Sequence, residues 1–308
     1  MTIEELNGAV VTGDIDELIR VSEARQCKAL SKIADTIVAR PGLRLVLLAG
    51  GSSAGKTTTA KRLCTQLRVN GVKALHLSTD DYFVGDARNP RNPDGSFDYE
   101  TIECVDRVRL AEDLNALMAG ATIHPRRFDF ARREGYDAEA TLTFPAGGVI
   151  VLEGIHALNP LLTEGVPEKC KFRLYIEPKT QLEIFALTRM PVTDGRFVRR
   201  LVRDNQFRKT SPVVTFEMWP KVLEGEKKWI EPFRAQADAE FDSGLDYELA
   251  VLKPYAAGLI EIVALKQPDN GRAKVFSELF AAIKGAAPTA VPGDSILRET
   301  IGGSQLEY

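Results

Sequence analysis

A glycine-rich segment followed by a lysine and a threonine is the part of this sequence that points most directly to chemistry. Residues 50–57 read GGSSAGKT and fit the phosphate-binding pattern G-x-x-x-x-G-K-[ST]. In such a loop, backbone N–H groups and the N-terminus of the next helix hold phosphate oxygens. We expect Lys56 to reach the β- and γ-phosphates and the Thr57 hydroxyl to bind Mg²⁺. The expected nucleotide-binding residues are Gly50, Gly51, Ser52, Ser53, Ala54, Gly55, Lys56, Thr57 and Thr58.

The elements that this loop needs on either side are also indicated. Residues 45–49 (LVLLA) form an apolar run typical of a buried strand, and residues 58–72 continue with a helical pattern. A strand, a glycine loop and a helix in this order are what the motif requires. This context disfavours the simpler interpretation that residues 50–57 are an ordinary glycine turn.

Carboxylates follow two further expected strands. Asp80 and Asp81 come directly after residues 74–78, and Glu153 ends the apolar run at residues 148–152. Ligands bind at the carboxyl ends of parallel strands. An aspartate there can accept the proton of a substrate hydroxyl that attacks the γ-phosphate, and a glutamate can hold Mg²⁺. A turn or cap role for these side chains stays open as the alternative.

Arginines recur at a spacing that places them on one helix face. Arg196, Arg199, Arg200 and Arg203 are related by three or four residues, and Arg208 lies one turn further on. Clustered guanidinium groups repel each other without an anionic partner, and ATP phosphates suit them. We expect a helical lid in which Arg200 binds the nucleotide, while Arg203 and Arg208 stabilise the transferring phosphoryl group. The alternative is a solvated basic face paired with surface carboxylates.

Composition limits the class of protein. The chain has 308 residues, of which 44% are hydrophobic and 27% charged, as in ordinary globular proteins. A net charge of −3 gives no electrostatic argument for nucleic-acid binding, and no apolar run approaches the ~20 residues of a membrane span. The N-terminus lacks the basic region of a signal peptide. The four cysteines, which fit no zinc spacing, indicate reduced thiols in a cytoplasmic protein: Cys27, Cys64, Cys104 and Cys170.

Strand and helix signals alternate after residue 43, which predicts an α/β protein with a parallel sheet flanked by helices. We divide the chain into an N-terminal helical segment (1–43), a P-loop kinase domain (44–286) and a C-terminal tail (287–308). The N-terminal segment is expected to pack on the kinase domain or on a second subunit, and the second alternative would make the protein a homo-oligomer. Other expected elements are a β-hairpin excursion within 121–144, helices over 180–241 and a last strand at 247–252.

Five short segments carry a family resemblance: GGSSAGKTT at 50–58, LSTDDYF at 77–83, FDYE at 97–100, IVLEGI at 150–155 and RRLVRD at 199–204. Over about residues 45–255 the chain resembles the uridine kinases, in the phosphoribulokinase and uridine kinase family of P-loop kinases. The resemblance implies a P-loop NTPase-type fold with a β-hairpin that closes on the substrate and a helical lid. It also implies ATP and Mg²⁺ as cofactors and a nucleoside as substrate.

The resemblance assigns roles to single residues. The register of LSTDDYF puts the catalytic base on Asp80, and FDYE puts the residue that binds the ribose hydroxyls on Asp98. In the hairpin, Phe128 and Phe130 correspond to the aromatic pair that faces the nucleobase. Arg133 stands where uridine kinases have a histidine that reads the pyrimidine. Phosphorylation of a ribose-like hydroxyl is therefore better supported than selectivity for uracil.

The combined expectation is an ATP-dependent kinase that phosphorylates the 5′-hydroxyl of a uridine- or cytidine-like nucleoside. Kinases of another small alcohol or sugar, and a nucleotide-binding regulator without catalysis, are the alternatives. A GTPase is disfavoured because the sequence has no [NT]-K-x-D guanine-reading motif. Neither a nucleic acid nor a membrane is expected as a partner. The expected catalytic residues are Lys56, Asp80, Arg203 and Arg208, and the expected metal ligands are Thr57 and Glu153.

Overall fold

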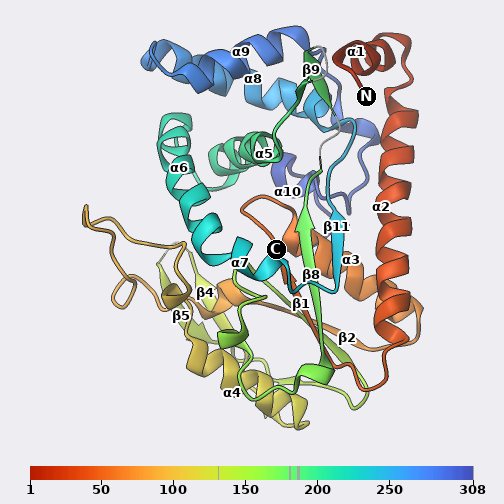
Figure 1. Ribbon diagram of the computed structural model, residues 1–308, viewed down its shortest axis with the longest axis vertical. Coiled ribbons are helices and arrows are strands. Elements are labelled where there is room, and N and C mark those ends of the chain that lie inside the picture. Colours follow the sequence, from red (N-terminus) through yellow and green to blue (C-terminus); the bar gives the residue numbers. More distant parts are fainter. Residues whose placement is uncertain (131, 180–181, 186–187, 308) are drawn as a thin grey trace.

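A parallel sheet forms the centre of the structure (Figure 1). The computed structural model describes residues 1–130, 132–179, 182–185 and 188–307. Among these residues, five strands pair in the order β11-β8-β1-β7-β2, and all neighbours are parallel. Their carboxyl ends therefore meet at one edge. The bounds are β1 Leu45–Ala49, β2 Ala74–Ser78, β7 Val149–Glu153, β8 Lys171–Glu177 and β11 Ala239–Asp242.

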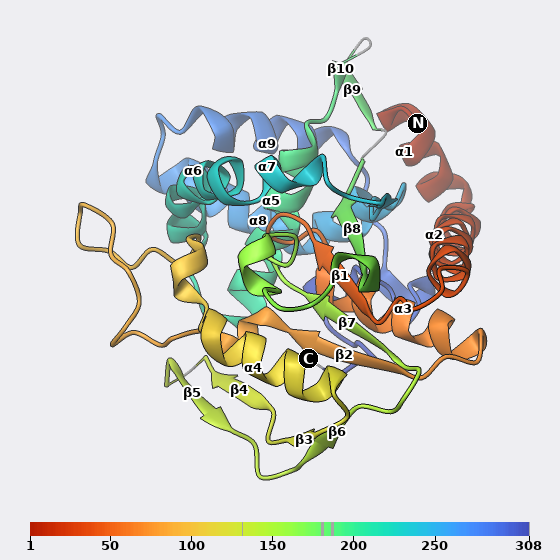
Figure 2. The same ribbon diagram turned by 60° about the horizontal axis from the view of Figure 1, so that its bottom comes forward.

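Helices cover both faces of this sheet (Figure 2). Helices α2 (Ile15–Val38) and α3 (Lys56–Val69) pack on one face, where Val46 and Leu48 point. Helix α4 (Arg107–Met118) packs on the other face, against Leu45 and Leu47. Alternate residues of a strand point to opposite faces, so a continuous apolar run such as β1 is needed to bury both. The predicted α/β class with a parallel sheet flanked by helices is confirmed.

A second helical layer lies beyond the carboxyl edge of the sheet (Figure 1). Phe197 of α5 is at its centre, stacked on Phe276 with ring centroids 5.3 Å apart and packed near Trp219. This layer holds the expected lid helix above the phosphate loop. Its helices are α1 (Ile3–Thr12), α5 (Val192–Phe207), α6 (Pro212–Trp229), α8 (Glu248–Lys266) and α9 (Gly271–Ala282), and the short α7 (Glu231–Arg234) follows α6.

Two antiparallel pairs form the expected excursion within 121–144. Strands β4 (Arg126–Asp129) and β5 (Glu134–Asp137) make the hairpin, and β3 (Thr122–Ile123) pairs with β6 (Leu142–Thr143) at its base. A further hairpin precedes the lid, with β9 (Glu183–Phe185) and β10 (Thr188–Arg189). The expectation of helices over 180–241 is therefore wrong at 183–185 and 188–189, and also at 239–241, which belong to β11. Residues 180–181 and 186–187 lie outside the described residues.

The expected last strand at residues 247–252 is wrong. The last strand of the sheet is β11, and residues 248–252 open helix α8, where Leu249 and Leu252 are buried in the helical layer. A short apolar run can belong to a buried strand or to a buried helix, and periodicity alone does not separate the two. The edge position next to β8 is instead filled by β11, a short strand that contains charged side chains.

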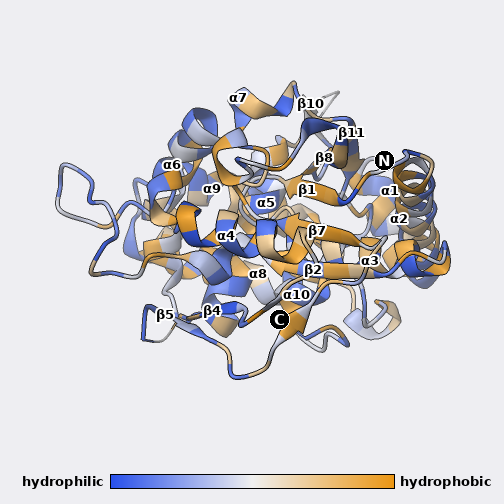
Figure 3. Ribbon diagram, turned by 90° about the horizontal axis from the view of Figure 1, so that it is seen from below, coloured by the Kyte–Doolittle hydropathy of each residue, from blue (hydrophilic) through white to orange (hydrophobic). Residues whose placement is uncertain are grey.

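Both terminal segments pack on the rest of the chain. Ile3 and Leu6 of α1 join the core of the helical layer, and Leu30 of α2 joins the core on one face of the sheet. In the tail, residues 295–297 are buried ahead of the short helix α10 (Arg298–Ile301). Hydrophobic residues follow the strands in the interior, and hydrophilic residues lie outside (Figure 3). No helix in the described part of the chain combines the length and apolar character needed to cross a membrane.

Candidate active site

The loop between β1 and α3 has the geometry that a phosphate-binding loop needs. Gly55 has φ +85° and Ser53 has φ +59°, so the chain turns through left-handed conformations before α3 begins at Lys56. The Lys56 ammonium folds back and donates to the Gly51 carbonyl at 3.0 Å. Loss of water around Lys56 lowers its pKa, while Glu153 and Asp80 favour its charged form. The loop thus presents a cation and the N-terminus of a helix to the same space.

The two aspartates that follow β2 have different surroundings. They lie on a 3₁₀ turn, Thr79–Tyr82. Asp81 accepts a hydrogen bond from Arg127 of the β4–β5 hairpin at 2.6 Å. Asp80 is instead coupled to Glu153 and Lys56: desolvation and the charge of Glu153 raise its pKa to about 6, while Lys56 opposes the rise. Of this pair, Asp80 is therefore the carboxylate whose charge interacts with Lys56 of the phosphate loop.

Glu153 lies at the end of β7, next to the expected metal ligand Thr57. The Thr57 hydroxyl donates to Glu153 Oε1 at 3.1 Å, and His76 Nε2 is 3.7 Å from the same oxygen. Burial alone would raise the pKa of Glu153, but His76 and Lys56 hold it below its ordinary value. An ionised carboxylate and a hydroxyl are oxygen ligands suited to Mg²⁺, which usually keeps several waters and phosphate oxygens. Within the described residues no group of three or more His, Cys, Asp or Glu could hold a metal by itself.

The arginines of α5 are buried against the loop and the helical layer. Arg200 Nη1 donates to Ser52 Oγ at 2.8 Å, which places this guanidinium at the phosphate loop. Arg199 is only 1% exposed and is paired instead with Glu248 of α8. The alternative of a solvated basic face is therefore wrong, because Arg196, Arg199 and Arg200 are all buried. Of the arginines expected to meet ATP, Arg200 lies at the phosphate loop, whereas Arg199 lies in the protein core.

Asp204, which sequence reasoning did not single out, connects three of the lid arginines. Its carboxylate accepts from Arg200 Nε at 3.1 Å and from Arg203 Nη2 at 2.9 Å, and Arg208 Nε lies 3.8 Å away. Desolvation and the neighbouring Arg203 lower the pKa of Arg208 to about 10, with Asp204 opposing the change. Arg208 also acts electrostatically on Asp80. One buried carboxylate thus offsets the repulsion within this arginine group.

The hairpin brings an aromatic cluster towards the aspartate turn. Phe128 and Phe130 pack edge to face with ring centroids 5.1 Å apart, and Phe83, which follows the turn, lies 5.5 Å from Phe128. Phe130 is 60% exposed. An exposed ring beside a partly buried pair offers a face for stacking a planar ligand. The expected substrate-facing pair is therefore brought together with the aspartate segment.

Arg133 and Asp98 already have partners within the protein. Arg133, at φ +56°, donates to Asp86 at 3.2 Å and to the Tyr99 hydroxyl at 3.0 Å. Asp98 Oδ1 accepts the backbone N–H of Glu100 at 3.0 Å, a turn that fixes the local backbone. Arg133 is thus tied to the 83–100 loop at the end of the hairpin, rather than pointing freely to solvent.

Two glutamates at the site were missed by the sequence analysis. Glu226 of α6 accepts the Ser52 N–H at 2.8 Å and forms a bidentate pair with Arg196 at 2.6 and 2.7 Å. Desolvation and the charge of Glu226 raise the pKa of Glu100 to about 7, although Arg200 and Lys56 oppose the rise. A Cβ at position 225 would overlap the Glu100 side chain, so a glycine is needed where α6 passes it. Glu100 ends the FDYE segment but received no role there, and no local pattern marks Glu226, because it reaches the loop through tertiary packing.

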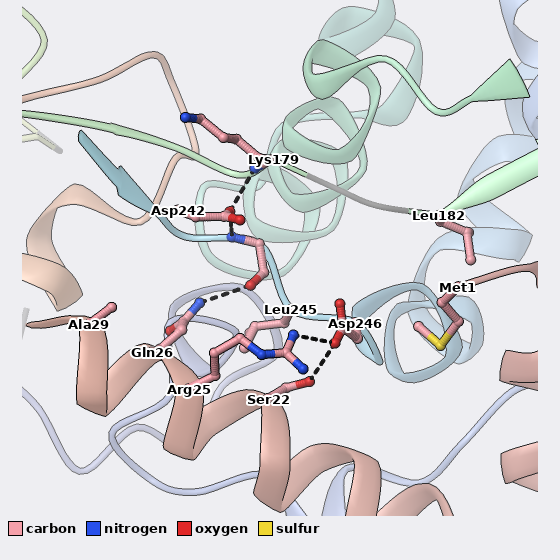
Figure 4. Close-up of a pocket in the computed structure, with 11 residues that line it drawn as sticks. Met1, Ser22, Arg25, Gln26, Ala29, Lys179, Leu182, Asp242, Leu245 and Asp246 are labelled. Carbon is pink, nitrogen blue, oxygen red and sulfur yellow. Dashed lines mark hydrogen bonds and ion pairs between the residues drawn. The ribbon is translucent and has the colours of Figure 1, made fainter.

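A separate cavity of about 250 Å³ lies between α2 and the ends of β8 and β11 (Figure 4). Asp246 accepts from Arg25 at 2.7 Å and from Ser22 at 3.4 Å. Gln26 donates to the Gly244 carbonyl at 3.1 Å. The polar groups drawn in Figure 4 therefore bind one another, and none of the expected site residues lines this cavity. The phosphate loop remains the candidate active site.

Comparisons with known proteins identify the family of this chain. Residues 45–250 match the model of the phosphoribulokinase / uridine kinase family. A uridine kinase from Deinococcus deserti is 28% identical over 198 residues, covering 64% of this chain and 86% of that protein. A uridine kinase from Staphylococcus aureus is 26% identical over 210 residues, covering 67% and 91%. A solved structure of a possible uridine kinase from Bacillus stearothermophilus is 20% identical with a TM-score of 0.46, covering 71% of this chain and all of that one.

The family model spans two thirds of the chain and includes the phosphate loop, the aspartate turn, the hairpin and the lid. The chain belongs to the phosphoribulokinase / uridine kinase family. It is an ATP-dependent kinase that acts on a small-molecule substrate. The expectations of family and of kinase activity are confirmed, whereas identities of 24–28% leave the acceptor substrate to be argued from the site.

Proposed function

We propose that this kinase transfers the γ-phosphoryl group of ATP to the 5′-hydroxyl of a pyrimidine-type nucleoside. The observation that carries the proposal is the placement of Asp80 beside Lys56 and Glu153, while the adjacent Asp81 is bound to Arg127. An ionised carboxylate that interacts with the lysine of the phosphate loop can accept a proton from an attacking alcohol. The names of the relatives supply the nucleoside class, since the curated relatives cited above are uridine kinases.

Asp80 is the general base of the proposed reaction. Its pKa of about 6 leaves it ionised at neutral pH and close enough to that pH to take up a proton. The proton of the 5′-hydroxyl passes to the Asp80 carboxylate as the oxygen attacks the γ-phosphorus and the bond to the β-phosphate oxygen breaks. Lys56 keeps Asp80 ionised before the reaction and meets the developing charge on the phosphoryl oxygens.

The lid arginines supply the remaining positive charge. Arg200 binds Ser52 of the loop, and Arg203 and Arg208 are held beside it through Asp204. Guanidinium groups on a transferring phosphoryl group stabilise charge that is spread over its oxygens. We expect α5 to close over ATP and exclude water, which would otherwise compete with the nucleoside as the acceptor.

Thr57 and Glu153 are the proposed Mg²⁺ ligands. Their oxygens lie 3.1 Å apart, and Glu153 is kept ionised by its neighbours. A metal ion held there would neutralise charge on the β- and γ-phosphate oxygens. The protein's own contribution is the placement of one hydroxyl and one carboxylate at the first turn of α3 and at the end of β7.

The acceptor end of the site favours a nucleoside over a sugar or a small alcohol. Phe83, Phe128 and Phe130 form an aromatic cluster on which a base can stack, and such a contact contributes roughly 1–3 kcal/mol per base. A sugar lacks a flat face of that size. Asp98 is proposed to orient the ribose through its second carboxylate oxygen. An enzyme of this kind would serve pyrimidine salvage in the cytoplasm, where its four free cysteines stay reduced.

Substrate kinetics test this function. Initial rates of ADP release would be compared for uridine, cytidine, 5′-deoxyuridine, adenosine, pantothenate and a panel of sugars, with Asp80→Asn as the inactive control. We expect turnover with a pyrimidine nucleoside and none with 5′-deoxyuridine, which lacks the acceptor oxygen. Turnover with a sugar or pantothenate, and none with any nucleoside, would replace the nucleoside assignment by the alternative within the family.

A further inference from the structure

The C-terminal segment, residues 295–300, lies against the phosphate loop although it is far outside the part of the chain that matches the family. Ile296 packs on the loop so closely that a Cβ on Gly55 would overlap its Cγ2 atom. The Thr58 hydroxyl, in the first turn of α3, donates to Glu299 Oε2 at 3.1 Å. Figure 1 shows α10 beside α3 and α5. A segment remote in sequence thus forms part of the surface where the nucleotide must bind.

The position of this segment corresponds to the base end of a nucleotide. Lys56 reaches the β- and γ-phosphates in a loop of this kind, and the N–H groups at the start of the helix hold the α- and β-phosphates. The ribose and the base must therefore leave the loop past the first turn of α3. Thr58 is the third residue of that helix, and Glu299 lies directly beside it.

A small cavity at this place has the chemistry of a base-binding site. It holds about 10 Å³, room for about one water, so α5 must move outward before a base can enter. Ile296 offers an aliphatic face, and the Arg203 guanidinium can stack on an aromatic plane. Glu299 adds a hydrogen-bond acceptor. The complete lining is Ser53, Gly55, Arg199, Arg203, Ile296, Glu299 and Thr300.

The segment is held rigidly enough to serve as a fixed wall. Arg298 donates to four backbone carbonyls of the tail, including those of Pro288 at 2.9 Å and Val291 at 2.6 Å. Ser295 is fully buried, and its hydroxyl is 3.3 Å from that of Tyr247, which in turn donates to Glu23 of α2. These contacts hold Ile296 and Glu299 against α2 and the start of α8, and α10 also packs on α5.

We propose that residues 295–300 form the wall of the donor-base site, and that Glu299 accepts a hydrogen bond from the 6-amino group of adenine. Glu299 Oε2 already binds Thr58, and no donor in the described part of the chain binds Oε1. A carboxylate offers about four lone-pair sites, so Oε1 can accept an amino N–H. This inference depends on the proposed function only in placing ATP in the phosphate loop. It makes Glu299 a residue that selects the base of the phosphate donor.

Calorimetric binding of two diphosphates tests the proposal without any acceptor substrate. ADP would be compared with purine riboside 5′-diphosphate, which lacks only the 6-amino group. We expect the wild-type protein to bind ADP at least about tenfold more tightly, as for a hydrogen bond to a charged group. Glu299→Ala should bind the two ligands about equally, because its binding of ADP becomes weaker. Equal binding of the two ligands by the wild type would overturn the proposal, and so would tighter binding of GDP than of ADP.

Two further variants separate base recognition from damage to the fold. Glu299→Gln keeps an oxygen acceptor and the contact with Thr58, so it should retain part of the preference for ADP. Asp294→Ala removes an exposed acidic residue directly before this segment and should leave the preference unchanged. A full preference in Glu299→Ala, or its loss in Asp294→Ala, would contradict a specific role for Glu299. If the wild type bound none of the diphosphates, the nucleotide site itself would be overturned. The absence of nucleoside kinase activity would leave this binding comparison unaffected.

Discussion

Arg127 of the hairpin donates to the Asp81 carboxylate at 2.6 Å, and this contact separates the roles of two adjacent aspartates. Asp81 fastens the hairpin to the turn after β2, which leaves Asp80 to face Lys56. A general base must have its carboxylate open to the acceptor hydroxyl. The hairpin that carries Phe128 and Phe130 therefore also helps to define which aspartate is the proposed base.

Substituting each aspartate tests this division. Asp80→Asn should lower kcat by about 10²-fold or more, the usual contribution of a general base, with little change in nucleoside affinity. Asp81→Asn should chiefly raise the KM for the nucleoside, because it loosens the hairpin. Steady-state kinetics with a fluorescence-based binding assay would measure both effects. A larger fall in kcat for Asp81→Asn than for Asp80→Asn would exchange the two roles.

The pH dependence of the reaction should reflect Asp80. Because the base must be ionised and its pKa is raised to about 6, kcat/KM should rise with pH and level off above that value. The raised pKa also means that the folded state binds the proton more tightly than the unfolded state. The stability contributed by the protonated form is thus complete below about pH 4 and is lost as the pH rises through about 6. Rate profiles and melting curves between pH 4.5 and 8, compared for the wild type and Asp80→Asn, would measure both, and the change near pH 6 should be absent from the variant.

The metal site makes a separate prediction. Thr57→Val should weaken Mg²⁺-dependent binding of ATP and lower turnover, because it removes a proposed ligand. Glu153→Gln should lower turnover more than ATP binding, since it removes charge but keeps an oxygen. Titrations of activity with Mg²⁺ at fixed ATP would show a raised half-saturation in both variants. An unchanged Mg²⁺ dependence in both would remove Thr57 and Glu153 from the metal site.

Lid arginines that bind phosphate should differ from those that hold the fold. Arg208→Ala should reduce kcat/KM by about 10²-fold or more, because it removes a proposed phosphoryl-binding charge. The Arg208 side chain is 52% exposed, so the same substitution should shift the melting temperature by only a few degrees. Arg199 is buried against Glu248, and Arg199→Ala should lower the melting temperature markedly by leaving a carboxylate unpaired. Calorimetry and kinetics on both variants give the comparison. Full activity of Arg208→Ala would refute its role in phosphoryl transfer.

Arg133 bears on the choice of base. It is held by Asp86 and Tyr99, and a guanidinium only donates hydrogen bonds, whereas an imidazole can also accept them. We expect weaker or less selective activity on uridine and cytidine than a typical uridine kinase shows. Arg133→His should change the ratio of kcat/KM between pyrimidine and purine nucleosides. Strong and selective phosphorylation of uridine by the wild type, unaltered by this substitution, would refute the expectation.

The phosphate loop and the aspartate turn could be predicted because each is a short contiguous segment next to an apolar strand. Lys56, Thr57 and Asp80 needed no tertiary information: the motif and its flanking pattern put them at the carboxyl edge of the sheet. The parallel sheet followed from the same alternation of strands and helices. Local patterns were less informative for residues 247–252, where an apolar run belongs to a buried helix.

Residues brought in by tertiary packing could not be predicted. Glu226 binds the N–H of Ser52, which is 174 positions away in the sequence. Glu299 is 241 positions from Thr58, in a tail that reads as a linker and a terminal extension. An acidic residue on a helix looks the same in sequence whether it faces solvent or a phosphate loop. Only the packing of α6 and of the tail onto the loop distinguishes them.

The identity of the phosphorylated product tests the central claim most directly. Purified protein would be incubated with ATP, Mg²⁺ and uridine or cytidine, and the product would be analysed by mass spectrometry and ³¹P NMR. The account predicts one nucleoside 5′-monophosphate for each ADP released, and no product with Asp80→Asn. Release of ADP without a phosphorylated nucleoside, or a phosphate on the 2′- or 3′-oxygen, would contradict it.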